Sequence, residues 1–178
     1  MIHMPQMFRG LIVDTSDSTR VEITSSELER FQLMPGDLVF ARRSLNFEGA
    51  GQCSLISDLP EKTTYESSII RVRLRVERIK SAFVNYFLNS DLGFRLRIPL
   101  IRQVAVSGVS SEDIASIPIP CPSIKEQELI LAVLDVLHSI ELIEEDCLEK
   151  LKLFKKGLMH DLLTGRVRVV TDEELEGW

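Results

Sequence analysis

The chain has 178 residues, a net charge of −6 and 44% hydrophobic residues, which is ordinary for a globular protein with one domain and an appendage. No run reaches the 18 or more apolar residues of a membrane helix, and the first ten residues lack the order of a signal peptide, so we expect a cytoplasmic protein without membrane contact. The cysteines, Cys53, Cys121 and Cys147, are odd in number and widely spaced, which argues against a disulfide framework or a close-spaced metal pair.

The negative charge is concentrated in the last third of the chain. Residues 1–121 hold 14 Lys plus Arg and 14 Asp plus Glu, whereas residues 122–178 hold 7 and 13. Twelve of the 14 basic residues in the first part are arginines, whose planar guanidinium groups suit phosphate oxygens and the guanine edge. This composition permits DNA binding but does not demonstrate it.

Short apolar runs separated by turn residues predict a β-rich α+β module before residue 118. The runs are residues 10–13, 38–41 and 69–76. Two helices are also expected. The first covers residues 25–31 with a cap at Ser25 or Ser26, and the second runs from residue 76 or 77 to residue 88.

A polar loop follows the second apolar run and gives the first set of candidate DNA contacts. Arginine can grip phosphate or read guanine, Asn and Gln can pair with adenine, and nearby glycines let backbone amides approach a phosphate. An ordinary polar loop is an equally good interpretation from the residues alone. The candidates are Arg42, Arg43, Ser44, Asn46 and Gln52.

Arg71, Arg73 and Arg75 form the second set, because they alternate with apolar residues. A strand through all three would place their guanidinium groups on one face, where they could contact phosphates. A solvated sheet face and ion pairing with the acidic residues of the same domain are equally open alternatives.

A long amphipathic helix is predicted after the alternating prolines of residues 117–122, which favour a stiff, extended connector. The S-x-x-E spacing of Ser123 and Glu126 is typical of an N-terminal cap, and Gly165 marks the end. Glu144 alone interrupts an apolar heptad seam, which we expect to pair with another long helix; packing within the chain is the alternative. The seam consists of Ile130, Val133, Leu137, Ile140, Cys147, Leu151, Phe154 and Leu158.

No common catalytic motif is present, and the three histidines do not cluster. His138 and His160 are 22 residues apart on the predicted helix, too far apart to share a metal. We therefore expect a non-catalytic protein without cofactor or metal.

Several segments resemble the DNA specificity subunits of type I restriction-modification systems. The pattern I-P-x-P-x-P-x-x-x-E-Q at residues 117–127 is similar to the junction between a recognition domain and a helix in that family. The match begins upstream of this junction, at residues 110–114. The family's helix ending is similar to residues 155–167, which contain the sequence LLTG. A strand of the family's recognition domain is similar to residues 35–42.

The resemblance implies a subunit that selects a double-stranded DNA sequence, while type I methyltransferase subunits modify adenine and restriction subunits translocate and cleave DNA. It also implies a target-recognition domain at 1–117, shortened at its start, a connector at 118–122, a spacer and dimerisation helix at 123–165 and a tail at 166–178. Family members have two recognition domains and two antiparallel helices, so a half-subunit of this kind is expected to form a homodimer through its seam.

One alternative follows from the shortened recognition domain. The chain is then an assembly or competitor protein that acts through its coiled-coil helix without reading DNA.

Overall fold

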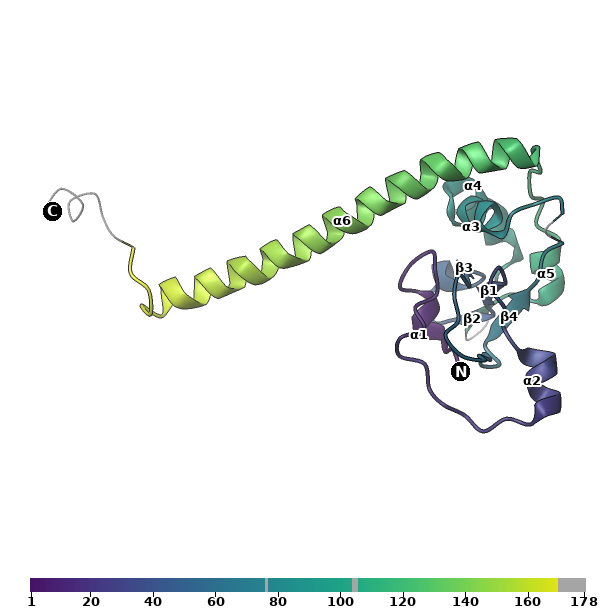
Figure 1. The fold of residues 1–178 in the computed structure, drawn as a ribbon, viewed down its shortest axis with the longest axis horizontal. Helices are drawn as coiled ribbons and strands as arrows, with labels where there is room; N and C mark the ends of the chain where they lie inside the picture. The colour runs from purple at the N-terminus through teal and green to yellow at the C-terminus, as the bar shows by residue number, and fades with distance from the viewer. Residues whose placement is uncertain (76, 104–105, 170–178) are drawn as a thin grey trace, which may run out of the picture. The chain divides into compact units, whose positions relative to one another are not determined.

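The computed structural model describes residues 1–75, 77–103 and 106–169 (Figure 1). Contacts divide the chain into one unit from Met1 to Leu131 and a second unit from Ala132 onward. The first unit combines two small antiparallel sheets with short helices, and a long helix follows, so the expected α+β class is confirmed. Within the described residues, no helix combines the length and apolar character needed to cross a membrane.

The main sheet has β1 (Leu38–Ala41) between β3 (Cys53–Leu55) and β4 (Ile69–Val72), with both pairings antiparallel. All four residues of β1 are buried, as its uninterrupted apolar sequence predicts for a strand covered on both faces. Alternation along the strand places Leu38 and Phe40 in one apolar cluster and Val39 and Ala41 in another. The central strand therefore joins the two cores of the unit.

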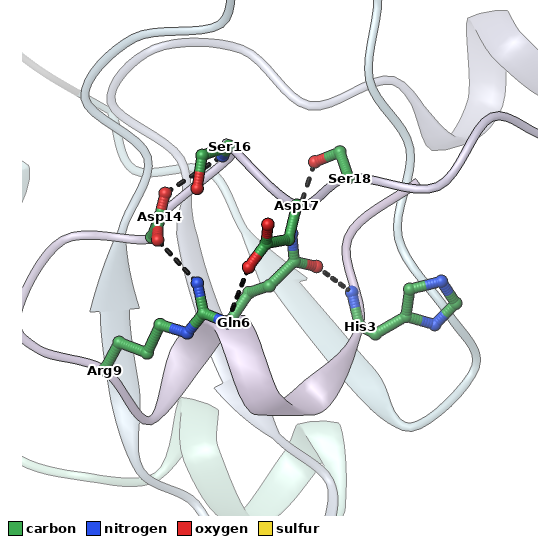
Figure 2. Close-up of polar contacts among 7 residues, drawn as sticks. All are labelled: His3, Gln6, Arg9, Asp14, Ser16, Asp17 and Ser18. Atoms are coloured by element: carbon green, nitrogen blue, oxygen red, sulfur yellow. Dashed lines mark hydrogen bonds and ion pairs between the residues drawn. The ribbon is translucent and has the colours of Figure 1, made fainter.

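The first cluster packs against α3 (Ser81–Asn89), α4 (Asp91–Arg97) and α5 (Ser111–Ala115). The second cluster includes residues of the N-terminal segment, where α1 (Met4–Met7) lies. Arg9 is held in this segment by two ion pairs, since its Nη1 and Nη2 each lie 2.7 Å from a carboxylate oxygen, of Asp14 and Asp17 respectively (Figure 2).

Two predictions for the first third of the chain need correction. Helix α2 (Ser25–Phe31) has the expected bounds, but its cap is Thr24, whose Oγ1 accepts a hydrogen bond from the Glu27 amide. Thr24 has an extended backbone, as a capping residue requires, whereas Ser25 already belongs to the helix. The apolar run at residues 10–13 forms only an isolated bridge, from Ile12 to Leu55.

Strand β4 ends at Val72 rather than at residue 76, which lies outside the described residues. Its partner β1 begins at Leu38, opposite Val72, and the preceding Gly36 turns the chain away with φ of +89°. Helix α3 begins at Ser81, four or five residues later than predicted, because Lys80 is extended and its amide donates to Gln127 Oε1 at 2.8 Å. In both cases a partner distant in the sequence sets the boundary.

A second sheet, absent from the sequence prediction, has the order β2 (Arg43–Ser44), β6 (Ser107–Gly108) and β5 (Arg102–Gln103). Each strand has two residues, which is too short to show alternation in the sequence. The 3-10 helices η1 (Phe47–Gly49) and η2 (Ile98–Leu100) complete the elements of the first unit that precede the long helix.

Helix α6 (Ile124–Leu163) is the predicted long helix, 40 residues and about 60 Å in length. Ser123 Oγ accepts from the Glu126 amide, which confirms the predicted cap. Gln127 is fully buried, and its amide nitrogen donates to the carbonyls of Arg78 and Pro122 at 3.2 and 2.8 Å. Gln127 thus fixes the first turn of α6 within the first unit.

The second unit contains the rest of α6 and the residues that follow it. Its seam side chains are exposed: Cys147 is exposed, and the other exposed fractions lie between 43% for Leu158 and 65% for Phe154. Glu144, the break in the seam, is also exposed. Most of the tail predicted at 166–178 lies outside the described residues.

Candidate nucleic-acid interface

The register of the second sheet places two arginines in one row. Arg43 of β2 and Arg102 of β5 are both paired with Gly108 of β6, from opposite sides. Residues directly opposite one another in an antiparallel sheet point to the same face, so both guanidinium groups leave the sheet on the same side. Gly108 has no side chain between them. A Cβ at Gly108 would meet Arg42 O at 3.1 Å, which also explains why a small residue is needed there.

These arginines line a groove of about 700 Å³, which we call the arginine groove. Arg42 also lines it, together with Ser110 and Ser111. The backbone of Arg42 is fixed on both sides, because its amide donates to Ser68 O at 2.8 Å and its carbonyl accepts from the Val109 amide at 3.0 Å. The groove thus combines three guanidinium groups with two hydroxyl groups on a rigid backbone.

The charge of the arginine groove is predominantly positive. Arg42 and Arg43 are exposed, and neither has an ion-pair partner within the described part of the chain. Arg102 is 73% exposed and lies 3.2 Å from Asp113. Hydrogen bonds from the Ser110 amide and hydroxyl lower the pKa of Asp113, so its carboxylate stays charged and orients Arg102. Glu112 is the acid that lines the groove itself.

The loop after β2 is anchored by a buried arginine that sequence reasoning missed. Arg97 of α4 is 7% exposed, and its Nη2 donates to Glu48 O at 3.1 Å. Its Cδ would lie 2.9 Å from a Cβ at Gly51, a residue with φ of +71° whose amide donates to Ala41 O. Burial lowers the pKa of Arg97, whose guanidinium also lies 5.2 Å from the centre of the Phe94 ring. These contacts connect the loop to α4.

A second groove of about 390 Å³ adjoins the arginine groove, because Arg43 and Val106 line both. We call it the apolar groove. Its lining includes Ser44 and Asn46, two further candidates from the sequence, with Met4, Phe8, Leu45 and Ser68. Gln52 lies beyond η1, where its backbone carbonyl accepts from the Ala41 amide at 3.0 Å. The two adjoining grooves therefore bring together four of the five loop candidates, namely Arg42, Arg43, Ser44 and Asn46.

The second set of candidates is arranged differently from the prediction. A strand through Arg71, Arg73 and Arg75 does not form, since β4 ends at Val72 and only Arg71 belongs to it. Arg71 Nη1 donates to Gln32 O at 2.7 Å, and Arg73 pairs with buried Asp37. Arg75 is exposed outside the strands.

Arg71 lines another groove of about 640 Å³, with Arg42, Tyr65 and Phe31. Three glutamates, Glu22, Glu27 and Glu66, line this groove as well. Their charges oppose the approach of phosphate. The arginine groove is the better candidate interface for a polyanion.

Sequence reasoning missed Arg102 as well as Arg97. The neighbours of Arg102, Ile101 and Gln103, give no alternating pattern. Its relation to Arg43 depends on the local pairing of β5 with β6 and on the pairing of β6 with β2, which is far away in the sequence. Among the described residues, no group of three or more His, Cys, Asp or Glu side chains is arranged to hold a metal ion.

The fold and the grooves define a class of protein: a small α+β domain with a cationic groove, joined to a long helix with an exposed apolar seam. Residues 13–153 match the type I restriction modification DNA specificity domain family. The match covers well over half of the chain, so the chain belongs to this family, and the resemblance seen in the sequence is confirmed.

Named relatives agree with this assignment. The chain is 29% identical over 129 residues to the type I restriction enzyme EcoKI specificity subunit of Escherichia coli (strain K12), covering 71% of this chain and 28% of the relative. It is 25% identical over 137 residues to the MjaVIII specificity subunit of Methanocaldococcus jannaschii, covering 77% of this chain and 32% of the relative. The chain thus spans about a third or less of these relatives.

Proposed function

We propose that this chain is a DNA sequence-specificity subunit or half-subunit of a type I restriction-modification complex. Its first unit binds double-stranded DNA through the arginine groove, and its long helix pairs with a second helix. Adenine methylation, DNA translocation and cleavage belong to partner subunits in the cytoplasm, and this chain is non-catalytic. The observation that carries the proposal is the row of Arg43, Gly108 and Arg102, which presents two exposed guanidinium groups on one face of a sheet.

The spacing of this row suits a nucleic-acid backbone. Arg43 and Arg102 lie on the two strands flanking β6, so their Cα atoms are about 10 Å apart. Arg42 adds a third charge from the same groove. Guanidinium groups donate two parallel hydrogen bonds to a phosphate or to guanine O6 and N7, so one surface can hold the backbone and reach base edges.

The exposed seam of α6 supports a paired helix. Eight apolar side chains at heptad spacing form an exposed stripe along the helix. Burying one such side chain completely against a partner contributes about 1.5 to 3 kcal/mol relative to leaving it in water. A second copy of this chain offers a matching stripe, which supports a homodimer with two symmetry-related recognition domains. Another specificity chain is the alternative partner.

The DNA-binding proposal is tested by fluorescence anisotropy with a labelled duplex over a range of salt concentrations. The variant Arg43→Ala/Arg102→Ala should lose about tenfold or more in affinity, and its salt slope should fall by about 0.9 for each phosphate contact removed. Arg30→Ala/Arg95→Ala is the matched control, because it also removes two exposed arginines and neither of them lines either groove. Equal losses in the two variants would show that net charge, and not this groove, governs binding.

The second candidate function is an assembly or competitor protein that acts only through α6, and the exposed seam favours it equally. Mapping of N6-methyladenine across the genome of a host carrying the partner methyltransferase, with and without this gene, separates the two. A new bipartite motif supports sequence recognition, and a palindromic motif supports the homodimer. Binding to the methyltransferase without any new motif supports the assembly protein.

A further inference from the structure

Leu45 has the largest exposed fraction, 92%, among the large apolar side chains of the described residues. A single exposed leucine is common on protein surfaces and needs no explanation. Leu45, however, borders the apolar groove, whose lining includes Phe8 and Val106, themselves 40% and 43% exposed. An apolar surface therefore lies directly beside Arg43.

The backbone that carries Leu45 is held from both sides. The Asn46 amide donates to Ser44 Oγ at 3.2 Å, which closes the turn around Leu45. Ser44 packs against Gly49, because a Cβ at Gly49 would lie 2.4 Å from Ser44 Oγ. The carbonyl of Glu48 is bound by Arg97. The turn is thus preorganised, and the exposure of Leu45 is a property of the folded loop.

The groove beside Leu45 has the charge expected of a surface that meets DNA. Among the described residues, its lining contains one cation, Arg43, and no acidic side chain. Arg43 is shared with the arginine groove, so a duplex held there brings its base edges close to Leu45. The exposed base group that an apolar side chain recognises in the major groove is the 5-methyl group of thymine.

We propose that Leu45 is a specificity-determining residue that contacts a thymine methyl group in the recognised DNA. This inference rests on the proposed function. Arg42, Arg43 and Arg102 hold the phosphates, whereas Leu45 with the apolar groove favours thymine over bases without a methyl group. Leu45 was not among the candidates predicted from the sequence, because only its polar neighbours have side chains that can hydrogen-bond to DNA.

The test uses the full-length chain and a duplex that the wild-type chain selects from a random pool. That duplex is synthesised with thymine or with uracil, which lacks only the 5-methyl group. Wild type should bind the thymine duplex about fourfold more tightly for each methyl contacted. Leu45→Ala should bind both duplexes with nearly equal affinity. Leu92→Ala, which removes a leucine 57% exposed on α4, should keep the wild-type preference.

Three outcomes would overturn the inference: no consensus in the selected pool, no thymine preference in the wild type, or an unchanged preference in Leu45→Ala. Weaker binding of Leu45→Ala to methyltransferase subunits, with its thymine preference intact, would assign the side chain to a protein contact instead. Failure of the proposed function gives a different result. In that case Arg43→Ala/Arg102→Ala has the same total affinity for DNA as the wild type, and this result does not depend on Leu45.

Discussion

Arg73 and Asp37 form a two-point ion pair, with Nε 2.6 Å from Oδ1 and Nη2 2.7 Å from Oδ2. The Asp37 side chain is 1% exposed and the Arg73 side chain 45%. Asp37 also accepts from the Met34 amide at 2.8 Å, so it organises the turn that precedes β1. The pair gives Arg73 a role in folding that is independent of DNA.

Replacing Arg73 tests that role. Arg73→Ala leaves a buried carboxylate without its cation, and we expect the free energy of unfolding to fall by about 3 kcal/mol. Chemical denaturation measures the change. The double variant Asp37→Ala/Arg73→Ala should lose less than the sum of the single variants. A stable Arg73→Ala protein with weakened DNA binding would instead place Arg73 in the interface.

Gly51 is expected to tolerate no side chain. Its φ of +71° disfavours other residues, and a Cβ would press on Arg97, which anchors the loop. Gly51→Ala should lower the free energy of unfolding by about 1 to 3 kcal/mol. Gly10→Ala is the control, since a Cβ at Gly10 would have no atom of the described residues within 4 Å. Similar thermal midpoints for the two variants would contradict the proposed packing of Arg97.

The three thiols should differ in reactivity. Cys53 is buried, and burial raises its pKa, whereas Cys121 and Cys147 are exposed. A thiol reagent should modify two cysteines rapidly in the dilute native protein and the third only after unfolding. Because Cys147 lies in the seam, its reaction should slow as protein concentration rises if α6 pairs through this face. Modification that is independent of concentration would argue against pairing at Cys147.

Glu144 interrupts the seam, so Glu144→Leu should strengthen self-association by tenfold or more as two apolar side chains are buried together. Sedimentation equilibrium measures the dissociation constant. Glu145→Leu is the matched control, because the next residue projects about 100° around the helix and lies off the seam. Equal effects from the two substitutions would show that general hydrophobicity, and not the seam, drives association.

Asp14 provides a prediction for pH dependence. Hydrogen bonds from the side chain and amide of Ser16, with a further one from Arg9, lower the pKa of Asp14 from 3.8 to about 2. Because the pKa is lower in the folded state, this contribution to stability is complete above about pH 4 and is lost as pH falls toward 2. Carboxyl titration by NMR should give a midpoint near 2 for the wild type and a higher value for Ser16→Ala. A wild-type midpoint near 3.8 would contradict these contacts.

Local patterns were good predictors wherever the sequence neighbours supplied the stabilising interactions. The apolar residues of 38–41 predicted a buried strand, and the cap at Ser123 with the heptad spacing predicted α6 almost to the residue. Helix α2 had the right bounds but the wrong cap, since Thr24 and Ser25 are equally suitable by residue type. Only the backbone conformation of Thr24 decides between them.

Pairing between distant segments limited the prediction elsewhere. The end of β4 follows from the length of β1, and the start of α3 follows from a hydrogen bond to Gln127, which is 47 residues from Lys80. The second sheet joins strands of only two residues, so the pairing between segments stabilises it and local β propensity does not. For the same reason, the sequence did not predict that Arg102 lies in the same row as Arg43.

The α+β class, the long heptad helix, the family and the loop that contains Arg42 and Arg43 could all be predicted from the sequence, because periodicity, caps and motifs involve residues close together in the chain. Three relationships became visible only in the folded chain: Arg102 lies in one row with Arg43 across Gly108, Arg73 pairs with Asp37, and Leu45 is exposed beside a cationic groove. Those relationships connect residues tens of positions apart, and they exist only once the chain has paid the entropy of bringing its strands together.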